Sequence, residues 1–320
     1  MAYATVVENF LRYVKLDTQS SEETSDKVPS TDKQRALAKL LQQELTALGA
    51  SQVRYDEAHS YVYAVIPSNI EGQNEAPAVG FIAHMDTAPA VSGADVNPRI
   101  IENYDGNDIV LNQEQQIVTR VSEFPMLRDC RGKQLIVTDG NTLLGGDDKA
   151  GVAEIMAMAA YLLAHPEIKH GKVCIGFTPD EEVGNGVEYF DIKNFGADYA
   201  YTVDGGMLGD LSYECFHAAG AVLTVTGKSV HPGYAKNIMK NAVKLAYEFH
   251  AALPDECPEN TEGYEGFYHV DGMKGTVEQA VAEYIIRDHD KAKFEERKAI
   301  FQKTAETLNQ KYGAGTFEVK

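Results

Sequence analysis

The chain has 320 residues, a net charge of −19 and a hydrophobic content of 44 %. This length is enough for two domains, and this hydrophobic content is enough to build a sizeable core. Nucleic acids and anionic membranes attract basic surfaces, so a strongly acidic chain is not expected to bind either of them.

The first 17 residues predict an amphipathic helix, because Val6, Phe10 and Val14 recur on one helical face. This segment lacks the basic start, apolar middle and cleavage site of a signal peptide. The longest apolar stretch, residues 151–164, is too short to span a bilayer. The four cysteines are widely spaced and form no C-x-x-C pair, so we expect free, mostly buried thiols. These features predict a cytoplasmic protein.

Residues 1–212 alternate helical and strand-like patterns, and we expect them to form a first domain. A helix is predicted over residues 31–48, with Thr31 and Gln34 as a capping box. A second helix is predicted over residues 149–163. The strand-like runs are residues 61–66, 78–83, 135–138, 173–177 and 199–203. Such alternation predicts an α/β sheet that helices cover on both faces.

Residues 213–320 follow a different pattern and are expected to form a second domain. The predicted strands are residues 216–226, 267–273, 277–287 and 317–320, and the predicted helices are residues 235–253 and 291–311. This β-α-β-β-α-β order is typical of an α+β domain in which helices cover one face of an antiparallel sheet.

Acidic residues gather at strand ends and at a helix start in the first domain. The four clusters are His84 with Asp86, Asp147 with Asp148, Glu181 with Glu182, and Asp204. Each cluster alone also fits a common turn, a helix start or a solvated loop. Ligand sites in α/β sheets lie outside the carboxyl ends of the strands, so the clusters are expected to converge. Imidazole and carboxylate ligands suit Zn²⁺, and one carboxylate can bridge two ions.

With these clusters in view, the whole chain closely resembles one branch of a di-zinc peptidase family, the tripeptide aminopeptidases. The wider family also holds carboxypeptidases, acylases and succinyl-amino-acid deacylases. The matching motifs are "LDTQS" (16–20), "TPDEEVG" (178–184), "YTVDGG" (201–206), "HPG" (231–233), "TEGYEGFYH" (261–269), "MKGT" (273–276) and "YIIRD" (284–288). The motifs at 261–269 and 273–276 are specific for the branch. The resemblance implies a mixed-sheet catalytic domain and an α+β lid domain.

The resemblance also implies two zinc ions per subunit and a role for each ligand. His84 and Asp204 would hold one zinc, Glu182 would hold the other, and Asp147 would bridge them. Asp86 would be the acid that fixes the tautomer and basicity of His84.

The remaining acids of the clusters have different expected roles. Glu181 resembles the general base, which takes a proton from a zinc-bound water and passes it to the leaving amine. Asp148 is expected to be a helix-start carboxylate, and Asp180 is expected to be structural.

Two residues of the second domain match positions that contact substrate in the family. His231 resembles the lid histidine that stabilises the oxyanion of the tetrahedral intermediate. Arg287 resembles the group that binds the substrate carboxylate, with an ion pair to Asp288 or Asp290 as the alternative. The resemblance also allows for a homodimer through this domain.

The activity that the resemblance implies is release of the N-terminal residue from tripeptides. The same site could hydrolyse an N-acyl amino acid, because the chemistry at the carbonyl is the same. A third alternative is a catalytically silent metal-binding protein. Family members return from the lid to a segment that supplies the histidine of the second zinc. This chain ends at "GTFEVK" (315–320), so we expect a second site without its histidine and little activity from these residues alone.

Overall fold

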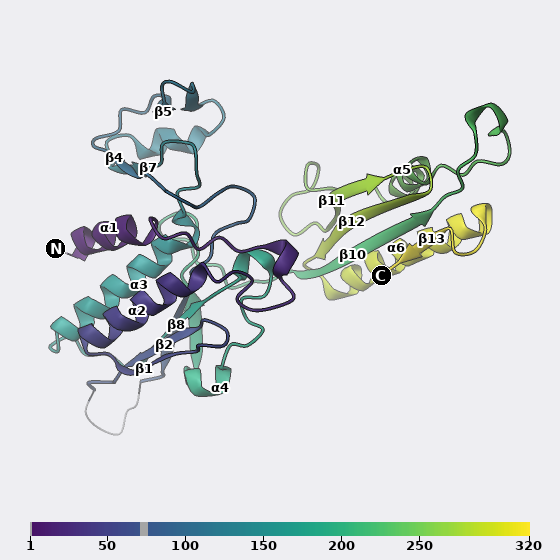
Figure 1. Ribbon diagram of the computed structural model, residues 1–320. Helices are drawn as coiled ribbons and strands as arrows, with labels where there is room; N and C mark the ends of the chain where they lie inside the picture. The colour runs from purple at the N-terminus through teal and green to yellow at the C-terminus, as the bar shows by residue number, and fades with distance from the viewer. Residues whose placement is uncertain (1, 71–75) are drawn as a thin grey trace. The chain divides into compact units, whose positions relative to one another are not determined.

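The computed structural model describes residues 2–70 and 76–320. The chain divides into two compact units, Met1–Asp210 and Leu211–Lys320 (Figure 1). Each unit has its own hydrophobic core. Among the described residues, no helix is both long and apolar enough to cross a membrane.

The first unit is built on a five-stranded mixed sheet. In spatial order its strands are β1 (Ser51–Tyr55), β2 (Val62–Ile66), β8 (Val173–Thr178), β3 (Val79–His84) and β9 (Tyr199–Thr202). β2 pairs antiparallel with both β1 and β8, whereas β8, β3 and β9 run parallel to one another. β2 and β8 are interior strands, and every one of their residues is buried, as their continuous apolar runs require. The carboxyl ends of the three parallel strands therefore meet at one edge.

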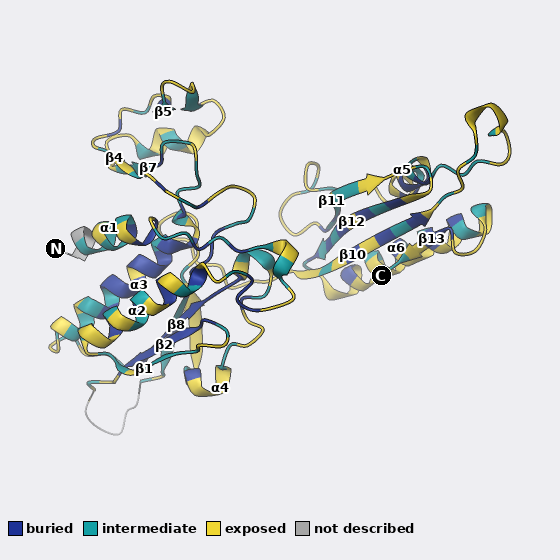
Figure 2. Cartoon of the chain, viewed as in Figure 1, coloured by how far each residue is buried: buried dark blue, intermediate teal, exposed yellow. Residues whose placement is uncertain are grey.

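Helices α1 (Ala2–Tyr13), α2 (Gln34–Leu48) and α3 (Gly146–Ala164) pack together over one face of this sheet (Figure 1). Their inward sides are buried and their outward sides exposed, as the colours of Figure 2 show. The short helix α4 (Ile192–Phe195) and its flanking residues contribute to a smaller cluster with side chains of β2 and β8. The α/β class predicted from the alternation of elements is confirmed.

The capping box predicted for α2 is wrong. The helix begins at Gln34 after Lys33, which makes no side-chain cap. The Thr31 hydroxyl donates instead to the carbonyl of Gln19, 2.6 Å away. Gln34 is fully buried and makes its hydrogen bonds to Asp180. Tertiary contacts, rather than the local cap, hold both side chains.

The start of α3 lies close to the end of β9. Asp147 and Asp148 have non-helical backbone angles, and the regular helix follows them. At Gly151 a Cβ atom would lie 1.9 Å from the carbonyl oxygen of Val203. Only glycine allows this close approach, which brings the acids at the start of α3 toward Asp204.

Two small sheets lie in the chain between β3 and α3. They pair β4 (Arg99–Ile101) with β7 (Leu135–Val137) and β5 (Ile109–Asn112) with β6 (Ile117–Thr119). The strand predicted at residues 135–138 therefore exists, but its expected place in the main sheet is wrong. It has only three residues, all half-buried, and a short apolar run does not specify its partner strand.

The second unit is an antiparallel sheet with two helices on one face. Its elements are β10 (His217–Thr226), α5 (Ala242–Ala252), β11 (Phe267–Gly275), β12 (Gln279–Asp288), α6 (Lys291–Tyr312) and β13 (Phe317–Val319). The strand order is β11-β12-β10-β13, and every pair is antiparallel. Alternate side chains of β10 and β12 enter the core against both helices. The predicted β-α-β-β-α-β order is confirmed, although α5 begins later than expected because Asn241 caps it.

All four cysteines are free. Cys174 is buried, Cys215 is exposed, and Cys130 and Cys257 are half-buried. The expectation of mostly buried thiols is therefore wrong.

Candidate metal centre

Three potential metal ligands come together where the parallel strands end. His84 is 2 % exposed at the end of β3, and its Nε2 lies 2.8 Å from Oδ1 of Asp147. The same nitrogen lies 3.7 Å from Oδ2 of Asp204 and 3.9 Å from Oε2 of Glu181. One atom each of His84, Asp147 and Asp204 lies within 4.8 Å of the others, which is close enough for a shared cation.

Chain topology explains this convergence. His84 ends β3, Glu181 follows β8, and Asp204 follows β9, so all three stand at the same edge of the sheet. Asp147 reaches them from the first turn of α3. Segments far apart in sequence thus supply one imidazole and three carboxylates.

Asp86 ties the histidine to the acidic loop after β8. Its carboxylate is fully buried and accepts hydrogen bonds from the backbone N–H groups of Glu181, at 3.0 Å, and Glu182, at 3.2 Å. Nδ1 of His84 lies 3.1 Å from the backbone carbonyl oxygen of Asp86 and 3.3 Å from its Oδ1. Asp86 is therefore placed to orient the imidazole and both glutamates at once.

The electrostatics of the group favour a cation. Burial lowers the pKa of His84, but Asp86, Asp148 and Asp147 more than offset this effect and raise it to about 10. Burial raises the pKa of Glu181 and of Asp204, and nearby carboxylates add to both increases. These acids repel one another, and a divalent ion between them would relieve that repulsion. The donor set therefore fits a metal ion that prefers nitrogen and oxygen ligands.

Asp148 stabilises the backbone at His84. It is 3 % exposed, and its carboxylate accepts from the backbone N–H groups of His84 and Gly151. Burial raises its pKa to about 8, although the nearby His84 acts in the opposite direction. The expected helix-start carboxylate thus also holds the backbone of a candidate ligand.

Lys149 and Gln34 are two buried polar residues near the site for which the sequence predicted no such role. The Nζ of Lys149 donates to the carbonyl of Leu16, and burial lowers its pKa to about 8. Gln34 contacts Asp180 in the acidic loop. A lysine directly after two aspartates could have indicated a buried charge near the site, whereas no local pattern around Gln34 indicated its contact with Asp180.

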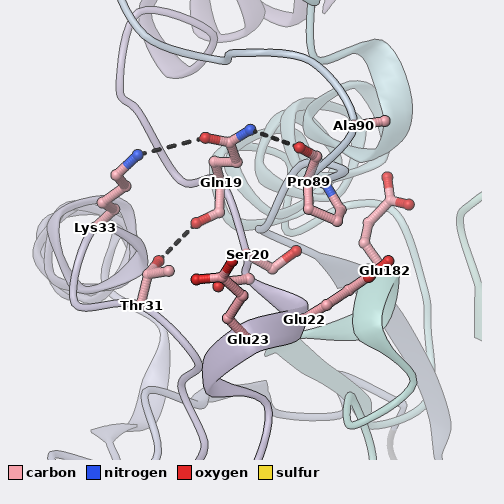
Figure 3. Close-up of a pocket in the computed structure, with 10 residues that line it drawn as sticks. Gln19, Ser20, Glu22, Glu23, Thr31, Lys33, Pro89, Ala90 and Glu182 are labelled. Atoms are coloured by element: carbon pink, nitrogen blue, oxygen red, sulfur yellow. Dashed lines mark hydrogen bonds between the residues drawn. The ribbon is translucent and has the colours of Figure 1, made fainter. Parts of the chain in front are cut away.

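A pocket of about 640 Å³ lies beside the acidic loop, and the Glu182 side chain forms part of its wall (Figure 3). The opposite wall comes from the segment after α1. In this segment the Gln19 side chain donates to the carbonyls of Pro89 and Val91, which lie in the loop after β3. The Glu182 carboxylate is not among the three converging ligand groups. Burial raises its pKa, and the negative charge of Asp147 raises it further, so the two carboxylates interact.

The second unit carries the two candidate substrate contacts. His231 is exposed, and its Nδ1 accepts from the backbone N–H of Gly233. The Arg287 guanidinium lies 4.1 Å from the ring centre of Phe216, and its buried Nε has no hydrogen-bond partner among the described residues. Arg287 and His289 line a pocket of about 210 Å³.

The alternative ion pair for Arg287 is wrong. Asp288 pairs with Arg297, at 2.7 Å, and Asp290 caps the start of α6.

Comparison with known proteins agrees with this architecture. Residues 213–316 match the family model of a peptidase dimerisation domain. The peptidase T of Clostridium novyi is 56 % identical over 316 residues, which cover 98 % of this chain and 77 % of that protein.

Two solved structures share the fold. The aminopeptidase PepT of Bacillus cereus aligns with a TM-score of 0.71 at 22 % identity, over 99 % of this chain and 74 % of its own. A tripeptidase of Staphylococcus aureus aligns with a TM-score of 0.68 at 20 % identity, with the same coverage.

Proposed function

Because this chain belongs to the peptidase T family, we propose that it is a metal-dependent aminopeptidase that releases the N-terminal residue of tripeptides. The observation that carries the proposal is the group around His84. Its Nε2 lies within 4 Å of carboxylates from three separate segments, those of Asp147, Glu181 and Asp204. A buried histidine surrounded in this way is typical of a metal centre.

We propose zinc as the metal, with two ions per subunit. His84 and Asp204 would hold one ion, Glu182 would hold the other, and Asp147 would contact both. Bound zinc would lower the pKa of a water molecule and polarise the peptide carbonyl.

Glu181 is the proposed general base. Its side chain is 54 % exposed, so both substrate and solvent can reach it. Burial and neighbouring acids raise its pKa above the ordinary value of a glutamate, although His84 acts in the opposite direction, and a higher pKa makes a carboxylate a stronger base. Glu181 would take a proton from the attacking water and deliver it to the leaving amine. Asp86 would keep this loop in place through the backbone of Glu181 and Glu182.

The second unit is proposed to bind the far end of the substrate. The Arg287 guanidinium suits a peptide carboxylate because it is a planar, always charged group that lines the pocket of about 210 Å³. His231 would donate to the oxygen of the tetrahedral intermediate. The match to a dimerisation domain supports a homodimer through this unit. Free cysteines support the cytoplasm as the site of this peptide catabolism.

Substrate assays can separate the proposal from its alternatives. With zinc present, we expect hydrolysis of tripeptides and little hydrolysis of N-acetyl or N-succinyl amino acids. Amidation of the tripeptide's C-terminus should raise KM, because Arg287 would lose its charged partner. Preferred hydrolysis of the acyl amino acids would support a deacylase instead. Metal binding without any hydrolysis would support the silent alternative.

A further inference from the structure

Three consecutive acids, Asp180, Glu181 and Glu182, follow β8, and Asp180 is the buried one. It contacts the start of α2 rather than the metal group. Its carboxylate is fully buried and accepts from the backbone N–H of Ser30, at 2.6 Å, and from the Ser30 hydroxyl, at 2.5 Å. A third hydrogen bond, also of 2.6 Å, comes from the side-chain amide of Gln34. A buried carboxylate with three donors is strongly fixed in position.

Gln34 holds Asp180 at two points. Its Nε2 donates to the Asp180 carboxylate, and its Oε1 accepts from the Asp180 backbone N–H, at 3.2 Å. Gln34 is itself fully buried and begins α2, so a regular helix anchors the contact. We call this pair the Asp180–Gln34 clamp.

The clamp acts on the segment that carries the proposed base and ligand. Asp180 has a left-handed backbone, with φ of 53°, a conformation that aspartate adopts more readily than most other residues but that still costs free energy. The next two backbone N–H groups, of Glu181 and Glu182, donate to Asp86. The clamp thus fixes the loop from one side, and Asp86 fixes it from the side of His84.

The clamp also adjoins one wall of the pocket of about 640 Å³. Ser30 and Gln34 flank Thr31 and Lys33, which line that wall opposite Glu182 (Figure 3). The pocket wall and the two glutamates therefore share one anchor.

We propose that Asp180 and Gln34 are positioning residues, which set the geometry of Glu181 and Glu182 for metal binding and proton transfer. This inference rests on the proposed roles of those two glutamates. Neither clamp residue touches the reacting atoms.

The hydrogen-bond pattern offers an isosteric test. In Asp180→Asn, the new NH2 group would face the amide of Gln34 or, after rotation, the backbone N–H of Ser30, so one donor would meet another in either orientation. Rotating Gln34 would not help, because its Nε2 would then face the Asp180 backbone N–H. In Gln34→Glu, two buried carboxylates would oppose each other. The double variant Asp180→Asn/Gln34→Glu restores a donor facing an acceptor at both points and conserves net charge.

We expect each single variant to bind zinc about 10–100-fold more weakly in chelator competition, as when a residue that supports a ligand is lost. In a folded, zinc-saturated protein, kcat should fall about tenfold or more, because small misplacements of catalytic groups are costly. KM should change much less. The double variant should recover to within about threefold of the unmodified protein, because the two effects are coupled. Gln43→Glu, at an exposed position of α2, is the control for added charge.

Thermal unfolding of every variant separates positioning from stability. Singles that unfold earlier but keep normal zinc affinity would overturn the inference, as would a double variant no better than the worse single. If the unmodified protein hydrolyses no tripeptide, the proposed function fails, yet the zinc-affinity cycle still tests the clamp.

Discussion

Replacing Asp86 by alanine tests how one buried carboxylate organises the centre. The substitution removes the acceptor for the backbone N–H groups of Glu181 and Glu182 and the carboxylate that lies 3.3 Å from His84 Nδ1. The backbone carbonyl of Asp86, which also contacts Nδ1, remains. Asp86 is fully buried, so water cannot readily replace it. We expect both the fold of the first unit and the metal affinity to suffer.

The structure gives an order of magnitude for each effect. A buried N–H group without an acceptor costs about 1–3 kcal/mol, so two such groups would cost at most about 2–6 kcal/mol of folding free energy. Both hydrogen bonds to Asp86 are only part-buried, so we expect a cost near the lower end of this range. Loss of a carboxylate behind a histidine ligand typically weakens metal binding by about 10–100-fold. That factor corresponds to about 1.4–2.8 kcal/mol.

Urea unfolding of the metal-free protein and zinc competition with a chelator would measure both effects. Asp86→Asn should lie between the alanine variant and the unmodified protein, because its amide oxygen can still accept one N–H. Asp26→Ala, at an exposed position, is the matched control. Unchanged unfolding and unchanged zinc affinity in Asp86→Ala would refute the reasoning.

Two further predictions concern the metal ligands. Asp147→Ala should lose more zinc per chain than His84→Ala, because a bridging carboxylate serves two ions; metal analysis showing equal loss would contradict the bridge. The pKa of His84 is raised from 6.5 to about 10, so its protonation stabilises the metal-free fold at low pH, and this stabilisation is lost as pH rises through 10. Zinc needs the neutral ring, so binding should release a proton and tighten between pH 6.5 and 9. Calorimetry in buffers of different ionisation enthalpy would detect the proton, and its absence near pH 7 would contradict the raised pKa.

The strand-end acids show how far the sequence could predict the site. His84, Glu181 and Asp204 each follow an apolar run, and parallel strands place such positions at one edge of a sheet. Their convergence therefore followed from local patterns and a general rule of topology. The individual roles of the site residues came from family resemblance and stay predictions; these residues are His84, Asp86, Asp147, Glu181, Glu182, Asp204, His231 and Arg287.

Contacts between distant segments could not be predicted in this way. Gln34 matched a capping box three residues after Thr31, but it binds Asp180, 146 residues away. No local pattern records such a pairing. The predicted position of β7 in the main sheet was wrong for the same reason, because its apolar run does not identify β4 as its partner strand.

The most direct test of the central claim is to measure zinc content and kcat together in Glu181→Gln. Glu181 lies beside the metal group, 3.9 Å from His84 Nε2, and is the proposed proton carrier, whereas the proposed ligands are other residues. Zinc content should therefore stay at the level of the unmodified protein, while kcat falls about 10²–10⁴-fold, the usual contribution of general acid–base catalysis. A fall in zinc content that parallels the loss of activity would make Glu181 a ligand and contradict the account.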